Sequence, residues 1–158
     1  MKTSFPPVAD ENARVLILGT MPGDESLHRQ EYYAHTRNRF WKLIAAIFNE
    51  TLPESYGERK KLLLKHHVAV WDVAEAAERE RSLDSAIVNE TPHDLDRFFD
   101  DHKKIELICF NGQKAAALYD RYFNRRQAMR YASLPSTSPA NAAIGWTELL
   151  TQWSVIKI

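Results

Sequence analysis

The sequence predicts an α/β fold in which helices cover both faces of a parallel sheet. Short apolar runs, typical of buried strands, alternate along the chain with segments whose apolar residues recur at helical spacing. This alternation is the pattern of βαβ units, whose crossover helices pack on the sheet. The chain has 158 residues, a length that fits one domain with a core of its own.

The first half of the chain supplies two of these strands. Residues 14–18 form an apolar run that predicts the first buried strand. Apolar residues recur every three or four positions over 38–49 and predict a helix, with Asn38 as its cap or first-turn residue. A second helix fits 57–66, and the apolar run at 68–71 predicts a second strand.

The second half continues the alternation to the end of the chain. Thr91 suits the N-cap of a helix, and Pro92 suits its first position. The predicted elements are a helix over 92–102, a strand over 105–110, a helix over 112–123, a strand over 129–134, a helix over 140–153 and a short last strand over 154–158.

Composition narrows the class of protein. The chain is 44% hydrophobic and 27% charged, with a formal net charge of zero. It contains no apolar run long enough to span a bilayer, and its first residues lack the apolar centre of a signal peptide. Cys109 is the only cysteine, so an internal disulfide is excluded. We therefore expect a cytoplasmic, monomeric protein with no membrane partner.

The distribution of charge is uneven. Residues 121–141 contain four arginines and no acid, namely Arg121, Arg125, Arg126 and Arg130. Such a stretch favours a basic patch that leads into residues 134–141 and contacts phosphate. A solvated helix end is the alternative, because arginine also suits the C-terminal end of a helix dipole.

Ligands of open α/β sheets bind at the carboxyl ends of the strands. The segments that follow the predicted strands are GTMPG (19–23), WDV (71–73), FNG (110–112) and LPSTSPAN (134–141). Three of these four are turns of small and polar residues. Their convergence predicts a site at this edge of the sheet.

Several familiar chemistries are excluded at that edge. GTMPG lacks the Gly-Lys-Ser/Thr of a phosphate-binding loop and the third glycine of a dinucleotide fingerprint, and the scattered histidines do not form a zinc set. Asp24 and Glu25 follow this turn. They could act as a base, or they could simply favour the N-terminus of a helix. What remains is a neutral, polar site that suits a flat hydrogen-bonding ligand such as a nucleobase.

The motifs GTMPGDESLHRQEYYAHTRNRFW (19–41), FNG and LPSTSPAN resemble the uracil-DNA glycosylase superfamily, in particular its hypoxanthine-DNA (deoxyinosine) glycosylase branch, which is similar to the mismatch-specific uracil glycosylases. The resemblance runs from Arg14 to Asn141. It implies a single domain over 1–158, a three-layer α/β/α sandwich with a short, mostly parallel central sheet. It also implies a base excision repair enzyme, without metal or cofactor, that removes a deaminated base, hypoxanthine above all, from double- or single-stranded DNA.

The resemblance implies a base pocket around the first motif. Gly19 and Gly23 allow a tight turn and a close approach to the base, while Pro22 fixes one angle between them. In well-known branches of the superfamily, the place of Met21 carries an Asp or Asn that positions water, which Met cannot do. Catalysis then moves elsewhere, or the protein is slow on uracil. The implied substrate-binding residues are Gly19, Thr20, Met21, Pro22, Gly23, Tyr33 and Asn111.

Three side chains carry the implied chemistry, each with a plainer alternative. Asn38 is the candidate catalytic residue, because its amide can hold a water. Alternatively, Asn38 is only a helix cap. Asn111 reads the base edge, or it is a residue tolerated at a strand-to-helix junction. Tyr33 stacks on the flipped base, or it packs a loop on the core. His35 ranks lower, and Phe40 is expected in the core.

The last motif is expected to contact DNA. Its hydroxyls can donate to phosphates, its proline stiffens the loop, and its end corresponds to residues that fill the gap left by a flipped nucleotide in relatives. A plain surface loop has the same composition. The implied DNA-binding residues are Ser136, Thr137, Ser138, Pro139, Ala140 and Asn141.

Three other functions stay open at this point. One is a uracil- or mismatch-specific DNA glycosylase, which differs in a few pocket atoms. Another is a catalytically inactive module that binds damaged DNA. The third is a hydrolase of free nucleosides, which the neutral overall charge allows.

Overall fold

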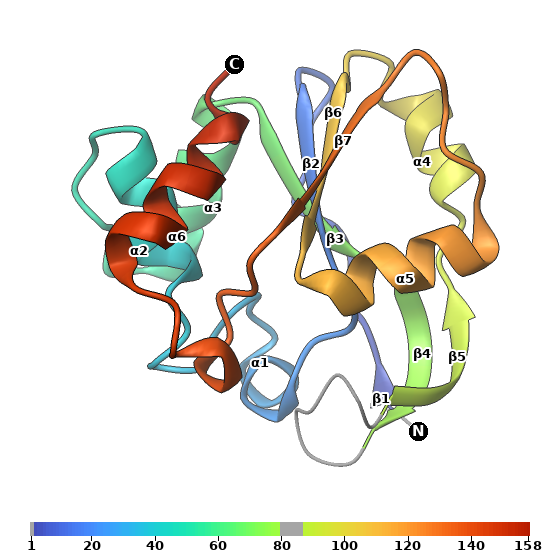
Figure 1. The fold of residues 1–158 in the computed structure, drawn as a ribbon, viewed down its shortest axis with the longest axis horizontal. Coiled ribbons are helices and arrows are strands. Elements are labelled where there is room, and N and C mark those ends of the chain that lie inside the picture. The colour runs from blue at the N-terminus through green and yellow to red at the C-terminus, as the bar shows by residue number, and fades with distance from the viewer. Residues whose placement is uncertain (1, 80–86) are drawn as a thin grey trace.

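The computed structural model describes residues 2–79 and 87–158. Its central sheet is parallel throughout, with the strand order β3-β2-β6-β7 (Figure 1). The four strands are β2 (Val15–Gly19), β3 (Val68–Asp72), β6 (Leu107–Asn111) and β7 (Arg130–Leu134). The predicted parallel sheet is confirmed, and its strands lie within two residues of the expected ranges.

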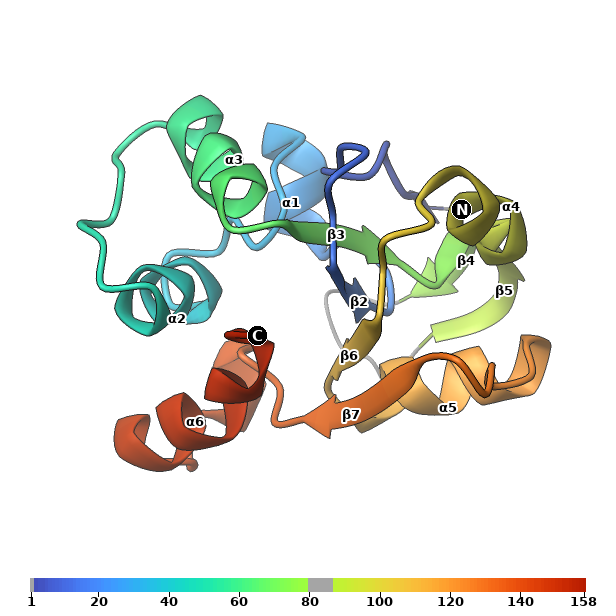
Figure 2. The same ribbon diagram turned by 90° about the horizontal axis from the view of Figure 1, so that it is seen from above.

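Helices cover both faces of this sheet, as Figure 2 shows from above. One layer holds α2 (Phe40–Ile47), α3 (Tyr56–Lys65) and α6 (Trp146–Trp153), and the other holds α4 (Leu95–Asp101) and α5 (Gln113–Tyr122). The α/β/α arrangement is therefore confirmed.

The side chains of β2 show why the sheet is buried on both faces. Val15 and Ile17 belong to the core on the side of α2, α3 and α6, while Leu16 and Leu18 belong to the core on the side of α4 and α5. Successive side chains of a strand point to opposite faces, so an unbroken apolar run supplies two cores at once.

A second, antiparallel sheet was not predicted. It has the order β1-β4-β5 and consists of β1 (Lys2–Thr3), β4 (Ala74–Arg79) and β5 (Ile87–Pro92). The expected helix over 92–102 begins later, because Thr91 and Pro92 end β5, an edge strand that tolerates proline. Asp94 caps α4 instead, accepting a hydrogen bond from the Arg97 N–H at 3.1 Å.

Other element boundaries also differ from prediction. A short helix, α1 (Asp24–Arg29), follows the GTMPG turn, in line with the interpretation of Asp24 and Glu25 as residues that favour a helix N-terminus. The helix expected over 140–153 is divided into a 3₁₀ turn, η2 (Pro139–Asn141), and α6. The tail expected as a strand is a 3₁₀ turn, η3 (Ser154–Ile156). Among the residues described, no helix is long and apolar enough to cross a bilayer.

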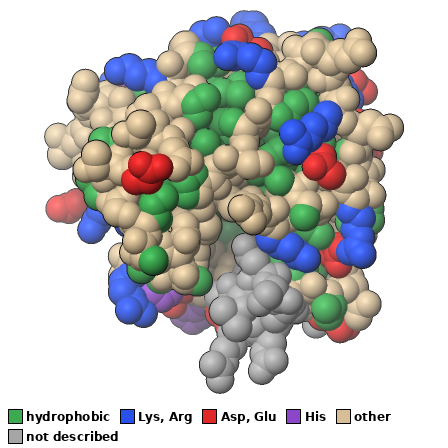
Figure 3. Space-filling view, viewed as in Figure 1, with side chains coloured by type: hydrophobic (Ala, Val, Ile, Leu, Met, Phe, Trp, Pro, Cys, Tyr) green, Lys and Arg blue, Asp and Glu red, His purple; other side chains and the backbone are tan. Residues whose placement is uncertain are grey.

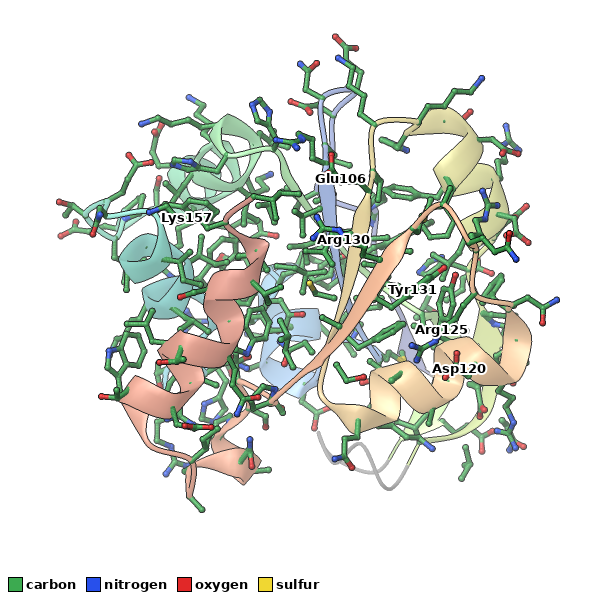
Figure 4. All side chains as sticks on the ribbon, turned by 45° about the horizontal axis from the view of Figure 1, so that its top comes forward. Glu106, Asp120, Arg125, Arg130, Tyr131 and Lys157 are labelled. Carbon is green, nitrogen blue, oxygen red and sulfur yellow. The ribbon has the colours of Figure 1, made fainter. Side chains whose placement is uncertain are left out.

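The expected basic patch is wrong, because all four arginines pair with acids. The pairs are Arg121–Glu90, Arg125–Asp120, Arg126–Asp96 and Arg130–Glu106. Figure 4 shows Arg125 beside Asp120 and Arg130 near Glu106, and Figure 3 shows acidic side chains next to basic ones on this side. Moreover, Arg130 begins β7, whereas the 134–141 loop follows its other end.

The side chain of His93, which follows β5, predicts that the stability of the fold depends on pH. The His93 ring stacks on Trp71 with centroids 4.0 Å apart, and its buried Nε2 has no hydrogen-bond partner among the described residues. Burial lowers the pKa of His93 from 6.5 to about 4. Below pH 6.5 the unfolded chain binds a proton that the folded chain rejects, so the free energy of unfolding falls until about pH 4.

We expect this contribution to be about 1–2 kcal/mol after solvent screening. A His93→Phe variant keeps an aromatic ring on Trp71 but cannot bind the proton. Urea denaturation at pH 7 and pH 4.5 should therefore show a smaller loss of stability in the variant than in the wild type. Equal losses would mean that other groups set the acid sensitivity.

Candidate active site at the carboxyl ends of the strands

A cavity of about 530 Å³ lies at the carboxyl ends of the central strands, a volume in the usual range for small-ligand sites. All four segments that follow the predicted strands contribute to it. The lining residues are Gly19, Thr20, Met21, Pro22, Gly23, Glu25, Ser26, Tyr32, Tyr33, His35, Arg37, Asn38, Asp72, Asn111, Ser136, Thr137, Ser138, Pro139 and Ala140. Every site residue predicted from the sequence lies here except Asn141.

Burial divides the cavity into a floor and a mouth. The floor comprises the buried lining residues Gly19, Thr20, Met21, Pro22, Ser26, Tyr32, Asp72, Asn111 and Thr137, and the mouth comprises the exposed residues His35, Arg37 and Ala140. Among the residues that the structure describes, no group of three or more His, Cys, Asp or Glu could hold a metal ion. The floor of the cavity therefore carries hydrogen-bonding groups, and its mouth carries exposed side chains that include a cation.

The turn after β2 fits tightly against its neighbours. A Cβ on Gly19 would lie 2.6 Å from the Asp72 Oδ1 and 3.2 Å from the Tyr33 hydroxyl, so only glycine leaves room for both. Met21 is buried in a small apolar cluster with Ala74, Ala77 and Ile87 of the second sheet. Met21 therefore anchors the turn and has no group that could orient water.

Tyr33 is held in an uncommon conformation. Its φ is 54°, in the left-handed region that large side chains rarely adopt, and such residues cluster at functional sites. One face of its ring stacks on Phe40, with centroids 4.1 Å apart and 29° between planes. Phe40 is fully buried, as expected for a core residue. The core thus fixes the Tyr33 ring at the cavity wall.

Asn38 both lines the cavity and closes a turn. Asn38 is not the N-cap of α2, as expected from the sequence, because that position is taken by Arg39; Asn38 lies one residue earlier. Its Oδ1 nevertheless accepts a hydrogen bond from the Phe40 N–H at 3.0 Å, which closes the turn that leads into α2. That contact uses one acceptor position of the side chain. An amide offers two N–H donors and a second lone pair on its oxygen, so the same side chain can also bind a water.

Asn111 is joined to the 134–141 loop by two hydrogen bonds. Its Nδ2 donates to the Thr137 Oγ1 at 3.0 Å, and its Oδ1 accepts from the Thr137 N–H at 3.0 Å. Thr137 is fully buried. The pair connects the end of β6 with the loop that follows β7, and it uses part of the amide that the sequence assigns to the base edge.

Further hydrogen bonds make the 134–141 loop rigid. The Ser136 and Ser138 hydroxyls accept from the N–H groups of Ser138 and Ala140, at 3.1 and 3.2 Å. The Arg39 guanidinium donates to the carbonyls of Asn141 and Ile144 at 3.1 and 2.8 Å. Asn141 itself faces the loop, since its Nδ2 donates to the Ser136 carbonyl at 3.1 Å.

Asp72 is the functional candidate that sequence reasoning missed. It ends β3, is 3% exposed, and accepts a hydrogen bond from the Ser4 hydroxyl at 3.2 Å. Burial, and secondly the charge of Asp72, raise the pKa of neighbouring Tyr32 far above its usual range, so Tyr32 stays neutral. The sequence did contain a signal for Asp72, namely an acid at the end of an otherwise apolar strand. Burying a carboxylate costs free energy unless it has partners, so such a position indicates a role.

Known proteins are similar to this chain in sequence and in fold. A family model described as "Uracil DNA glycosylase superfamily" matches residues 6–158. A Methanosarcina acetivorans protein named "Hypoxanthine DNA glycosylase" is 41% identical over 144 residues, covering 89% of each chain. A Methanosarcina barkeri protein of the same name is 36% identical over 156 residues, covering 93% of this chain and 96% of the relative.

A solved structure extends the similarity to three dimensions. It is a solution NMR structure of a Methanosarcina acetivorans protein described as a candidate uracil DNA glycosylase, with a TM-score of 0.87 and 36% identity. The match covers 99% of this chain and 96% of that one. The family match over nearly the whole sequence and the curated relatives agree with the fold, and the chain therefore belongs to the uracil DNA glycosylase superfamily.

Proposed function

We propose that this chain is a DNA glycosylase that hydrolyses the N-glycosidic bond of a deaminated base, with hypoxanthine as its preferred base. The observation that carries the proposal is the cavity, whose lining combines an aromatic ring fixed by Phe40 with buried hydrogen-bonding groups. The names of the two Methanosarcina relatives support the choice of hypoxanthine. The proposal keeps the single domain, monomeric state and cytoplasmic location expected from the sequence.

The reaction begins when the damaged nucleotide leaves the duplex and enters the cavity, which is easiest where its pair is weak. Tyr33 stacks on the base with the ring face opposite Phe40. As the glycosidic bond stretches, negative charge develops on the base and positive charge on the sugar. Backbone N–H groups of residues 19–23 stabilise the leaving base, and Asn38 orients the attacking water.

The 134–141 loop holds the DNA around the extruded nucleotide. Ser136 and Ser138 are half-buried at the cavity edge and contact phosphate, while Pro139 and Ala140 lie toward the mouth and fill the gap in the duplex. Thr137 is fully buried, so its part is to hold the loop on Asn111. Asn141 supports the loop through Ser136.

Excision assays distinguish this proposal from its alternatives. Under single-turnover conditions, duplexes with deoxyinosine, deoxyxanthosine or deoxyuridine are incubated with the protein and then cleaved by alkali at abasic sites. We expect the fastest cleavage at deoxyinosine. Fastest cleavage at deoxyuridine would favour a uracil glycosylase, which the description of the NMR relative suggests. Retained binding without cleavage of any duplex would identify a non-catalytic module.

Arg37 places a positive charge at the mouth of the cavity. Its backbone N–H donates to the His35 Nδ1 at 3.1 Å, which places both side chains on one short turn. We expect Arg37→Ala to weaken binding of all DNA sequences several-fold and to reduce the slope of log affinity against log salt by about one. Fluorescence anisotropy at several salt concentrations measures both quantities.

Arg97→Ala is the matched control, because Arg97 is exposed on α4 and does not line the cavity. It should leave the salt slope unchanged. If both variants behave alike, the mouth of the cavity is not where Arg37 meets phosphate.

A further inference from the structure

The floor of the cavity carries one acid among its described residues, Asp72. Its place is set by the sheet, because Asp72 pairs in register with Gly19 at the ends of β3 and β2. The Oδ1 lies only 2.6 Å from where a Gly19 Cβ would be, so the carboxyl group covers the first residue of the GTMPG turn. The glycine thus makes room for a carboxylate at the floor.

The depth of Asp72 decides which part of a nucleotide it meets. A flipped nucleotide stays joined to the DNA backbone, so its sugar and phosphates remain at the mouth and its base points to the floor. Asn38 is half-buried and follows the exposed residues His35 and Arg37, on the side where the sugar lies. Asp72 lines the cavity and is only 3% exposed, so the part of the nucleotide that enters deepest, the edge of the base, is the part that can meet it.

An ionised carboxylate can only accept hydrogen bonds. Deamination reverses the hydrogen-bonding character of one ring nitrogen: N1 of adenine is an acceptor, whereas N1 of hypoxanthine carries a hydrogen. The same change occurs at N3 when cytosine becomes uracil. A carboxylate at the base edge therefore attracts the deaminated base and repels the parent base.

We propose that Asp72 determines specificity by accepting a hydrogen bond from the ring N–H that deamination creates, N1–H of hypoxanthine or N3–H of uracil. This inference rests on the proposed glycosylase function and deepens it. It moves the acceptor role at the base edge away from Asn111, whose carbonyl oxygen already accepts from the Thr137 N–H. Asn111 retains a second N–H that can donate to O6 of hypoxanthine.

The N-terminal segment positions the carboxylate. The Ser4 hydroxyl donates to the Asp72 Oδ2, and the Ser4 N–H donates to the Glu75 carbonyl of β4 at 2.8 Å. A carboxylate has about four acceptor positions, so the contact with Ser4 is compatible with a bond to the base. Ser4 is thus a positioning residue for Asp72.

The test is a two-by-two comparison of wild type and Asp72→Asn on two substrates. Deoxyinosine carries the N1–H, and 2′-deoxynebularine has a purine ring without a hydrogen on N1. We expect Asp72→Asn to slow single-turnover excision of hypoxanthine about tenfold, because the amide oxygen can still accept the N1–H but the charge that strengthens this hydrogen bond is gone. Excision of purine from the nebularine duplex should change less than about threefold, because no such bond exists there.

An equal loss on both substrates would overturn the proposal, since it would indicate a role in water activation or in folding. A wild-type measurement avoids any folding defect of the variant: 1-methyl-2′-deoxyinosine replaces the N1–H by a methyl group and should be excised at least about tenfold more slowly than deoxyinosine. Equal rates would also overturn the proposal. Failure of the wild type on deoxyinosine itself would instead refute the proposed function.

Discussion

Replacing Asn38 with alanine is expected to lower the single-turnover rate of hypoxanthine excision by about 10²–10³-fold, the usual effect of removing a group that acts on the transition state. Asn38 lines the cavity, and in the place of Met21 this chain has no side chain that can orient water. Binding of the deoxyinosine duplex, measured by anisotropy, should change little because the stacking ring and the loop remain.

The turn contact of Asn38 requires a control for stability. Loss of the hydrogen bond to the Phe40 N–H should cost about 1 kcal/mol of unfolding free energy, too little to unfold the protein. The Asn38→Asp variant keeps an accepting oxygen for this contact and can also hold a water, so it should retain more activity than Asn38→Ala. Full excision activity in Asn38→Ala would remove Asn38 from the catalytic mechanism.

Replacing Gly19 with alanine should nearly abolish excision, by about 100-fold or more, while the protein still folds. The added methyl group would lie 2.6 Å from the Asp72 Oδ1 and 3.2 Å from the Tyr33 hydroxyl, so both groups must move. Overpacking of this kind costs about 1–3 kcal/mol of stability. Urea denaturation and single-turnover excision measure the two effects separately.

Gly57→Ala is the matched control for this prediction. Gly57 lies in α3, and a Cβ there would meet nothing within 4 Å. Alanine in a helix should raise stability by about 0.5–1 kcal/mol and leave excision unchanged. If Gly19→Ala retains wild-type excision, the close packing of the turn, Asp72 and Tyr33 is not needed for the reaction.

The central sheet could be predicted because β2, β3 and β6 are compact, buried apolar runs between segments of helical periodicity, whereas β7, which reads RYASL and is partly exposed, was found from its place in the alternation. The second sheet could not. β4 reads AEAAER, a sequence with little strand propensity, and its pairing with β5 is irregular. It pairs with β1 at the beginning of the chain, a contact across more than 70 positions that no local pattern encodes.

The parts of the candidate site that directly follow strand ends could be predicted from the sequence. The contacts that depend on residues far apart in the chain could not. The turns at 19–23 and 134–141 converge because parallel strands end at one edge. The reciprocal bonds of Asn111 and Thr137 join residues 26 positions apart and became visible only in the structure. The stretch of arginines was misjudged for the same reason, since Glu90 and Asp96, which neutralise two of them, lie far upstream.

The most direct test of the central claim is to measure released base and abasic sites together. The protein is incubated in excess with a deoxyinosine duplex, free hypoxanthine is quantified by mass spectrometry, and abasic sites are counted by alkali cleavage. The account predicts one hypoxanthine for each abasic site in the wild type and a much slower release in Asn38→Ala. Binding of the duplex with neither product, or strand cleavage without free hypoxanthine, would contradict it.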